Sequence, residues 1–448
     1  MVKKLAVLVA ALGFLFSCGN DPYDFPPYKP VRAVNQIVIP EEIHKRPYID
    51  IGFTLHGDEY HQVTFDLMKN KLNSNIIRTP ARWVDAEPVL YEPRQFNFTE
   101  HRRIANMALA NDFDLMFLVN DTPAWALPES MGNISHDPPD DPRMIYEYAY
   151  KLAEEFKGQI KSYQFYAEQN GHAPTTEENP HGWGHEPWRY YLIIMYGAHA
   201  VKSADPDAKV IFGGVGNAED RYLREIYELN NLVLDLIKDS SINLTQEQQT
   251  LLGNIPEHLD DLRLLFGEDP DMRKWYDKMA LHNYLAWNDP DVCNSECGGD
   301  RWHQGGGVIL SSMEDITCIS RLMDEYNDDK QIWITETGFS SWEPGYVNHE
   351  NIILLGRHIS EELAGIRTAR YLERLQTENQ FHRIERIFWY ELQDFTEEPQ
   401  YFGYREYGFG VLDNFYMDYD DIEEIPEDKF KPAFYSIKNF IERYSDDE

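Results

Sequence analysis

The sequence predicts an α/β fold of the (β/α)8 TIM-barrel class with extended βα loops, and two observations carry this prediction. Eight short apolar runs recur along the 448 residues, each ends in polar or aromatic residues, and amphipathic stretches separate them. Continuous apolar character indicates strands that are buried on both faces, as in a parallel sheet between helices. Eight such units over about 400 residues favour a barrel that is longer than usual because of insertions.

The predicted strands and helices alternate along the chain. The strands are expected at 48–57, 74–83, 114–125, 160–170, 208–217, 277–287, 330–339 and 384–394. In the helical stretch 141–158, one apolar stripe has spacings of four, three and four, at Ile145, Ala149, Leu152 and Phe156. Stretches 185–206 and 359–376 show the same pattern, and the largest inserts are expected at 126–142, 238–274 and 288–312. A doubly wound open sheet is the alternative, disfavoured because no nucleotide fingerprint follows the first strand.

The N-terminal residues predict an export signal and a tether. Two lysines precede an apolar run over 5–16, which is too short to span a bilayer comfortably and is closely followed by Cys18. The segment LFSC resembles a bacterial lipobox, which implies a signal peptide over 1–17 and lipidation of Cys18. An ordinary secretory signal is the alternative. The Pro-rich segment 18–44 then forms a tether, residues 45–448 form the barrel, and the chain is expected at the bacterial outer membrane, on its periplasmic or cell-surface face.

The charge and the cysteines limit the expected partners. A formal net charge of −36 argues against nucleic acid and anionic lipid, and it disfavours a polyanionic substrate. The spacing of Cys293 and Cys297 favours a loop disulfide over free thiols or half of a metal site. No metal and no other cofactor is predicted. The glycine-containing segment 213–220 is interpreted as a tight turn, because it lacks the third glycine of a nucleotide loop.

Two glutamates stand at the ends of predicted strands. Glu168 closes the fourth strand, in YQFYAEQNG, and Glu336 closes the seventh, in IWITETGF. Polar residues at the carboxyl ends of barrel strands meet at one rim, where catalysis occurs. Two carboxylates about 5–5.5 Å apart perform retaining glycoside hydrolysis, in which one protonates the leaving oxygen and the other attacks the anomeric carbon. A single glutamate at a strand end is often only a helix N-terminal charge, so the pair carries this prediction.

The order of these motifs resembles that of the clan A glycoside hydrolases, the 4/7 superfamily, and is most similar to the family 39 and family 5 type. This resemblance covers most of residues 45–445 and implies that Glu168 is the acid/base and Glu336 the nucleophile. It implies that Arg78, in IIRTPARW, supports the nucleophile. It also implies that His282 and Tyr284, in LHNY, lie beside the nucleophile.

The resemblance further implies a cleft that binds carbohydrate. Trp389 falls at strand eight, where clan members stack a sugar ring, and Trp125 lies in TPAWA, which is similar to family 39. Aromatic faces suit sugar rings, and seven tryptophans follow predicted strand ends: Trp83, Trp125, Trp183, Trp287, Trp302, Trp342 and Trp389. Of these, Trp125, Trp287 and Trp389 are the predicted substrate-binding residues. Trp333, inside strand seven, is expected to pack in the core.

One position departs from the clan pattern. Ala167 stands where most members have an asparagine that binds the sugar 2-hydroxyl. Either Asn120, Gln169 or Asn170 takes this role, or the substrate differs around C2, or activity is weakened or absent. We therefore expect a retaining glycosidase that acts on β-linked poly- or oligosaccharides, with Asn120 and Asn170 among its substrate-binding residues. A catalytically silent glycan-binding lipoprotein on the same barrel is the alternative.

Overall fold

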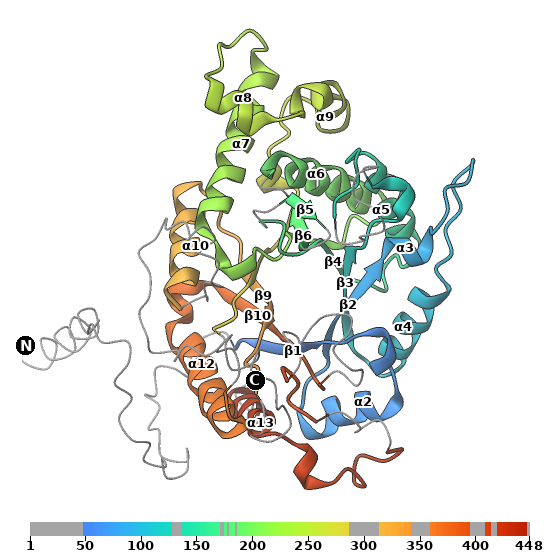
Figure 1. Ribbon diagram of the computed structural model, residues 1–448, viewed down its shortest axis with the longest axis vertical. Coiled ribbons are helices and arrows are strands. Elements are labelled where there is room, and N and C mark those ends of the chain that lie inside the picture. The colour runs from blue at the N-terminus through green and yellow to red at the C-terminus, as the bar shows by residue number, and fades with distance from the viewer. Residues whose placement is uncertain are drawn as a thin grey trace, which may run out of the picture.

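Eight parallel strands form the centre of the molecule, and helices surround them (Figure 1). The computed structural model describes residues 48–127, 137–170, 174–176, 179–183, 186–285, 313–341, 359–394, 408–413 and 419–445. The strands are β1 (Asp50–Thr54), β2 (Ile76–Arg82), β3 (Asp114–Asn120), β4 (Ser162–Phe165), β7 (Lys209–Ile211), β8 (Met279–His282), β9 (Ile332–Thr337) and β10 (Ile384–Trp389). Each of them lies inside one predicted segment.

The order of the strands makes a barrel. Neighbours follow the sequence β7-β4-β3-β2-β1-β10-β9-β8, and every pairing in this sheet is parallel. Backbone hydrogen bonds then join the two outer strands, from Phe212 N to Lys278 O at 2.9 Å and from Val215 N to Ala280 O at 3.1 Å. The predicted (β/α)8 barrel is therefore confirmed.

The helices follow the predicted alternation. They are α2 (Gln62–Asp66), α3 (Trp83–Ala86), α4 (Thr99–Ala110), α5 (Met144–Glu155), α6 (Pro187–Ala204), α7 (Asp220–Lys238), α8 (Gln246–Leu252), α9 (Leu259–Phe266), α10 (Met313–Glu325), α12 (Glu361–His382) and α13 (Pro432–Ser445). The predicted helical stretches correspond to α5, α6 and α12. None of the helices in these described ranges has the length and apolar character needed to cross a membrane.

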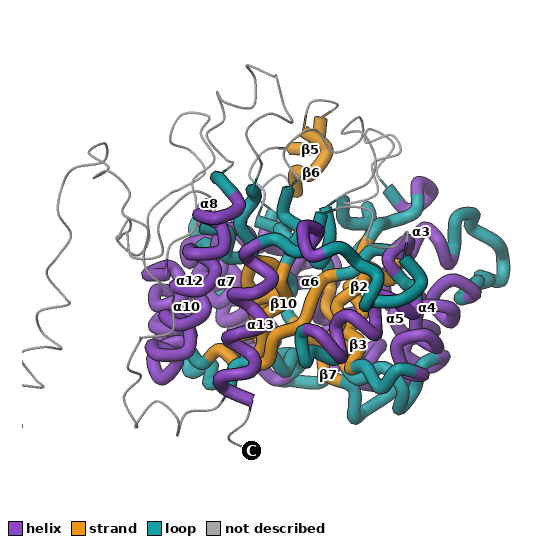
Figure 2. Tube along the Cα trace, turned by 90° about the horizontal axis from the view of Figure 1, so that it is seen from below, coloured by secondary structure: helices purple, strands orange, loops and turns teal. Residues whose placement is uncertain are grey.

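Two of the additions to the barrel can be placed. The predicted insert 238–274 contains α8 and α9, which lie outside the ring of helices at one edge of the molecule (Figure 1). A short antiparallel hairpin of β5 (Pro174–Thr176) and β6 (Asn179–Trp183) follows β4 and rises above the barrel strands (Figure 2). The insert 288–312 and most of 126–142 lie outside the described residues.

Alternating side chains separate the inside of the barrel from the helix-facing core. One buried cluster takes a single residue from each of six strands: Ile76, Met116, Ile211, Ala280, Trp333 and Phe388. Their strand neighbours, such as Ile77 and Leu115, belong to the larger core under the helices. Trp333 is 1% exposed, as expected for a core residue, and its indole Nε1 donates to Glu385 Oε2 at 2.6 Å. The cluster fills the barrel below the polar groups at the strand ends.

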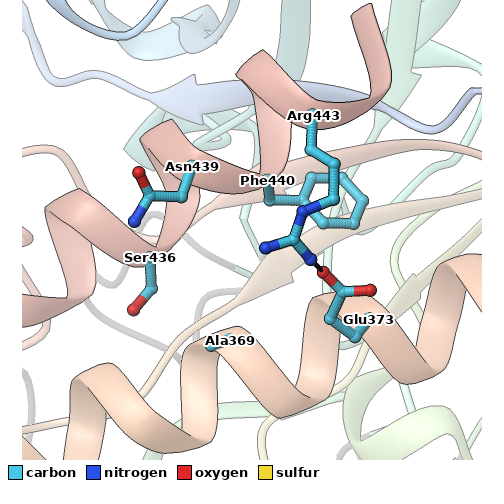
Figure 3. A pocket seen from close by; sticks show the side chains of 6 residues that line it. All are labelled: Ala369, Glu373, Ser436, Asn439, Phe440 and Arg443. Carbon is cyan, nitrogen blue, oxygen red and sulfur yellow. Dashed lines mark hydrogen bonds and ion pairs between the residues drawn. The ribbon is translucent and has the colours of Figure 1, made fainter. Parts of the chain in front are cut away.

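The last helix, α13, packs closely on α12. A cavity of about 30 Å³ between them is lined by Ala369, Glu373, Ser436, Asn439, Phe440 and Arg443 (Figure 3). Arg443 is bonded to Glu373, and Ser436 Oγ donates to Gly365 O at 2.8 Å. A cavity of this size holds about one water molecule, so this contact has a structural role and offers no room for a sugar.

A buried ion pair joins Asp394, after β10, to Lys431, just before α13, and a hydrogen bond ties Asp394 to the segment 408–413. Asp394 Oδ2 lies 2.6 Å from Lys431 Nζ, and Asp394 Oδ1 accepts from Gly410 N at 2.9 Å. Asp394 is 8% exposed and Lys431 is 3% exposed. Burial raises the pKa of Asp394, although the charge of Lys431 and these hydrogen bonds act in the opposite direction. The carboxylate therefore depends on Lys431 to remain charged.

Replacing Lys431 by methionine should leave this carboxylate buried without a cation. We expect Lys431→Met to reduce the free energy of unfolding at pH 7 by about 3–5 kcal/mol. The raised pKa of Asp394 rises further in this variant, so protonation removes the penalty as the pH falls. Denaturant titrations at pH 7 and at mildly acidic pH measure this difference. Lys438→Met, on the exposed side of α13, serves as the control and should change stability little; an equal loss in both variants at pH 7 would contradict the account.

Candidate active site

Glu336 lies at the carboxyl end of β9, and side chains on or just after two other strands of the barrel donate to its carboxylate. Arg78 Nη1, from β2, donates to Oε1 at 2.9 Å. The hydroxyl of Tyr284, just after β8, donates to Oε2 at 2.9 Å. The Glu336 side chain is 16% exposed and that of Arg78 is 1% exposed, so the ion pair is largely shielded from water. These are the neighbours that the sequence predicts for Glu336.

This environment favours the ionised form of Glu336. Burial acts to raise the pKa of Glu336, but the charges of His282 and Arg78 and the hydrogen bonds from Tyr284 and Arg78 outweigh it. The pKa of Glu336 therefore lies below its ordinary value. The result is a buried carboxylate that is charged at neutral pH.

An irregular sheet register aims Glu336 into the barrel. Thr335 faces the interior, where its Oγ1 accepts from Gln164 Nε2 at 3.3 Å, so strict alternation would turn Glu336 toward the helices. The pairing of β8 with β9 shifts register between Leu281 and His282. Such an irregularity re-aims a side chain, and it allows two consecutive residues of β9 to reach the same site.

Arg78 is fixed by three other strands. Its Nε donates to Gln164 Oε1 on β4 at 2.9 Å, and its Nη1 lies 3.4 Å from Thr54 Oγ1 on β1. Gln164 is fully buried. We did not predict a role for Gln164, although a glutamine in the middle of an apolar strand was the available signal.

Glu168 and His282 complete the group. Glu168 follows β4, and its side chain is 50% exposed. The Nδ1 atom of His282 lies 3.1 Å from Glu168 Oε1 and 3.3 Å from Glu336 Oε2. One ligand atom from each of these three side chains lies within 4.8 Å of the others. The two carboxylates therefore approach at about the 5–5.5 Å spacing of retaining glycosidases, well below the 6.5–9.5 Å of inverting ones.

The same three groups form a possible donor set for a metal. Imidazole nitrogen and carboxylate oxygen are both ligands of zinc in proteins. However, Arg78 lies 2.9 Å from one oxygen of Glu336 and brings a positive charge to it. The expectation of no metal is not tested by this arrangement and stays a prediction.

Two predicted substrate-binding residues lie at the rim. Asn120 ends β3, and its Oδ1 is buried without a hydrogen-bond partner among the described residues. Trp125 lies in the short helix Ala124–Ala126 and is partly exposed. Its Nε1 donates to Glu87 O at 2.9 Å, and its ring meets Trp83 edge to face at 5.6 Å. A substrate hydroxyl is a suitable partner for the unpaired oxygen of Asn120.

Two other predicted substrate-binding residues are placed differently from our expectation. Trp389 is 1% exposed and packs in the helix-facing core, with its ring 6.3 Å from that of Phe339. Phe388 occupies the barrel interior, so alternation turns Trp389 outward. Asn170 is fully buried, and its amide bonds to the backbone of Gly216. Neither side chain is therefore presented to a ligand at the rim.

The structure brings other aromatic and charged groups to the rim. Tyr390, two residues after Phe388, has its ring centred 6.2 Å from that of Tyr284 and 6.0 Å from that of His56. His56 Nε2 lies 3.2 Å from Glu391 Oε2, and Glu391 is 1% exposed. Tyr390 and His56 each lie two positions beyond an interior-facing residue. Alternation therefore points to them only once the facing of Phe388 and Thr54 is known.

Of the other tryptophans and cysteines named in the sequence, only some lie within the described residues. Trp83 and Trp183 are 0% and 5% exposed, so both are core residues. The described ranges do not include Cys18, Trp287, Trp302, Trp342, Cys293 or Cys297. Cys318, on α10, is disulfide-bonded. Its partner lies outside the described residues, and the proposed bond between Cys293 and Cys297 lies there too.

The fold is similar to solved structures of clan A glycoside hydrolases. A family 39 glycoside hydrolase from Bacteroides cellulosilyticus WH2 matches with a TM-score of 0.54 and 15% identity, over 89% of this chain and 64% of that chain, so this chain spans less than two thirds of its length. A monomeric β-xylosidase from Caulobacter crescentus CB15 matches with a TM-score of 0.53 and 13% identity, over 88% and 68%. A family 1 β-glucosidase from Exiguobacterium antarcticum B7 matches with a TM-score of 0.53 and 13% identity, over 90% and 99%.

No family model matches the sequence, and no curated protein matches it. At these low identities, the likeness shows the fold alone, which is a (β/α)8 barrel similar to those of these glycoside hydrolases. Activity and substrate must be argued from the site itself.

The Arg78 contact should set the protonation of Glu336. We expect Arg78→Met to raise the pKa of Glu336 by about 1–3 units, because a cation near a carboxylate stabilises the charged form. Carbon NMR of labelled glutamates over a pH titration, assigned with Glu336→Gln, measures this shift. Arg82→Met is the matched control, because Arg82 also lies on β2 but bonds to Asp121 at 2.6 Å. An unchanged titration midpoint in Arg78→Met would contradict the assigned role.

Proposed function

We propose that this protein is a retaining glycoside hydrolase that cleaves β-linked poly- or oligosaccharides by double displacement. The observation that carries the proposal is the approach of the Glu168 and Glu336 carboxylates at the strand ends of the barrel, with ligand atoms within 4.8 Å. This spacing leaves room for one glycosidic bond and none for an interposed water, which inversion requires.

The different surroundings of the two glutamates assign their roles. Glu336 is buried, ionised and oriented by Arg78 and Tyr284, so it is the nucleophile that attacks the anomeric carbon. Glu168 is half exposed, so it can reach the leaving oxygen and later the incoming water. In the first step the glycosidic C–O bond breaks as Glu168 gives its proton to the leaving oxygen. In the second step Glu168 takes a proton from water as the water oxygen bonds to the anomeric carbon and the bond from this carbon to Glu336 breaks.

Sugar binding is assigned to the rim groups beside the two carboxylates. The unpaired Oδ1 of Asn120 would accept from a sugar hydroxyl, which can replace part of the contact that Ala167 cannot make. The ring of Tyr390 offers an apolar surface, and the His56–Glu391 pair offers polar contacts. Trp125 remains a candidate for a further sugar contact, and so does Trp287, which lies outside the described residues. Because β-xylosidase and β-glucosidase are among the similar structures, aryl β-xylosides and β-glucosides are the first substrates to test.

Two substitutions test the roles separately. Glu336→Ala should abolish turnover of every substrate, because no covalent intermediate can form. Glu168→Ala should slow a phenyl glycoside by about 10²–10⁴-fold in kcat/KM but spare a dinitrophenyl glycoside, whose leaving group needs no proton. Azide should restore turnover of this variant and give a glycosyl azide with the configuration of the substrate.

The control is Glu154→Ala on α5, which alters a solvated glutamate and should leave both rates unchanged. If Glu168→Ala slowed both substrates equally, the acid/base assignment would be wrong. Binding of a glycan without any release of reducing ends, across a broad panel, would instead support a silent glycan-binding protein.

We also propose that the mature chain is anchored in the bacterial outer membrane through lipidated Cys18, on its periplasmic or cell-surface face. The support is the position of Cys18, which follows the apolar run 5–16 after the single residue Ser17. Cys18→Ala should move the protein from the detergent phase to the aqueous phase in a detergent phase partition and should remove palmitate labelling. Ser17→Ala is the control and should keep both properties. Retention of the label in Cys18→Ala would contradict the anchor.

A further inference from the structure

The turn that carries Glu168 rests on the backbone that follows β7. The Glu168 amide donates to Gly214 O at 2.8 Å, and Gln169 Nε2 donates to Gly213 O at 3.1 Å. Ala167 forms a parallel bridge with Gly214. The position of Glu168 is therefore defined by a neighbouring strand end as well as by its own strand.

Of the residues in this turn, Asn170 makes the largest number of hydrogen bonds to the segment after β7. Its Oδ1 accepts from Gly216 N at 2.8 Å, and its Nδ2 donates to Gly216 O at 3.0 Å. The same Nδ2 donates to Glu219 Oε2 at 2.8 Å. Asn170 is 0% exposed. Its amide is thus used inside the protein, which explains why it does not reach the substrate.

Close approach explains the glycines on the other side of this contact. A Cβ at Gly214 would overlap His282 Nε2 and lie 2.9 Å from Thr335 Oγ1. A Cβ at Gly216 would lie 3.1 Å from Asn170 Oδ1 and 3.4 Å from Glu168 Cγ. The segment 213–216 is therefore more than the tight turn that its sequence indicates, because its bare backbone lies against both Glu168 and His282.

The backbone at Glu168 makes such support necessary. Glu168 has φ of 54°, a left-handed conformation that non-glycine residues rarely adopt. A residue in this region keeps its conformation only where the surroundings enforce it. The half-exposed side chain has His282 as a hydrogen-bond partner. The direction of the carboxyl group is thus set largely by the turn beneath it.

We infer that Asn170 is a positioning residue that, with the backbone of Gly213–Gly216, holds the Glu168 carboxyl at its working distance from Glu336. This inference rests on the proposed function, in which Glu168 is the acid/base. It states that a contact which touches no substrate sets the position of the Glu168 carboxyl. A displacement of about 1 Å at a catalytic group can cost about 10²-fold in rate. The loss should fall on protonation of the leaving group and leave nucleophilic attack intact.

The test compares Asn170→Ala with Asn230→Ala in the full chain. Asn230 is also 0% exposed, accepts from Met272 N at 2.8 Å and donates to Asp271 Oδ1 at 3.0 Å, but it joins α7 to the short helix Met272–Lys274. The two variants thus lose similar buried hydrogen bonds. The measurements are melting temperature and kcat/KM on a phenyl and a dinitrophenyl glycoside.

We expect Asn170→Ala to lower kcat/KM on the phenyl glycoside by about 10²-fold and to change it little on the dinitrophenyl glycoside. Asn230→Ala should lower the melting temperature by a similar amount. Its kcat/KM should change little, and by the same factor, on the two substrates. If Asn170→Ala does not fold, Gly216→Ala keeps every hydrogen bond, presses on Asn170 and Glu168, and should show the same selective loss in smaller measure.

The outcomes separate this inference from the function on which it rests. If Glu168→Ala spares the dinitrophenyl glycoside but Asn170→Ala slows both substrates alike or neither, the function stands and the positioning role is wrong. If Glu168→Ala itself shows no dependence on the leaving group, the proposed acid/base role fails first. A selective loss in both variants supports the inference.

Discussion

The ion pair between Arg78 and Glu336 is the interaction on which the site depends. A buried guanidinium and a buried carboxylate are each costly unless their hydrogen-bonding capacity is met. Here Gln164 and Thr54 bind the guanidinium, whose Nη2 alone has no partner among the described residues, and Tyr284 binds the carboxylate, so five strands contribute to a single arrangement. The apolar cluster around Trp333 fills the barrel beneath them and keeps this polar layer at the rim. A substitution that moves any of these strands would therefore change the hydrogen bonds and the charge around Glu336.

The same constraint explains why two glutamates of one site differ so much. Glu336 is enclosed by the guanidinium of Arg78 and by hydrogen-bond donors that stabilise its charge, whereas Glu168 stands half exposed at the end of a turn. His282 contacts both, at 3.1 Å and 3.3 Å, and so links the two carboxylates. Rigid support of Glu336 comes from side chains inside the barrel. Support of Glu168 comes from the backbone of a neighbouring strand end.

Much of this arrangement was predictable because it follows from strand ends in chain order. All eight strands, and the meeting of Glu168 with Glu336, could be expected from the apolar runs and the residues that close them. The resemblance to clan A implied that Arg78, His282 and Tyr284 would join them. The direction in which an individual side chain faces could not be expected from the sequence. Trp389 and Tyr390 are adjacent in sequence, and only the register of β10 decides which of them faces the rim. Asn170 and the His56–Glu391 pair depend on contacts between distant segments, which no local pattern contains.

The central claim is that the two carboxylates are close enough for double displacement, and the configuration of the first product tests it most directly. Proton NMR can follow the anomeric signal of the sugar released from an aryl β-glycoside before mutarotation mixes the anomers. The close approach of Glu168, His282 and Glu336, whose ligand atoms lie within 4.8 Å of one another, predicts that the β-anomer forms first. Initial release of the α-anomer would show that a water attacks directly, and it would contradict the account.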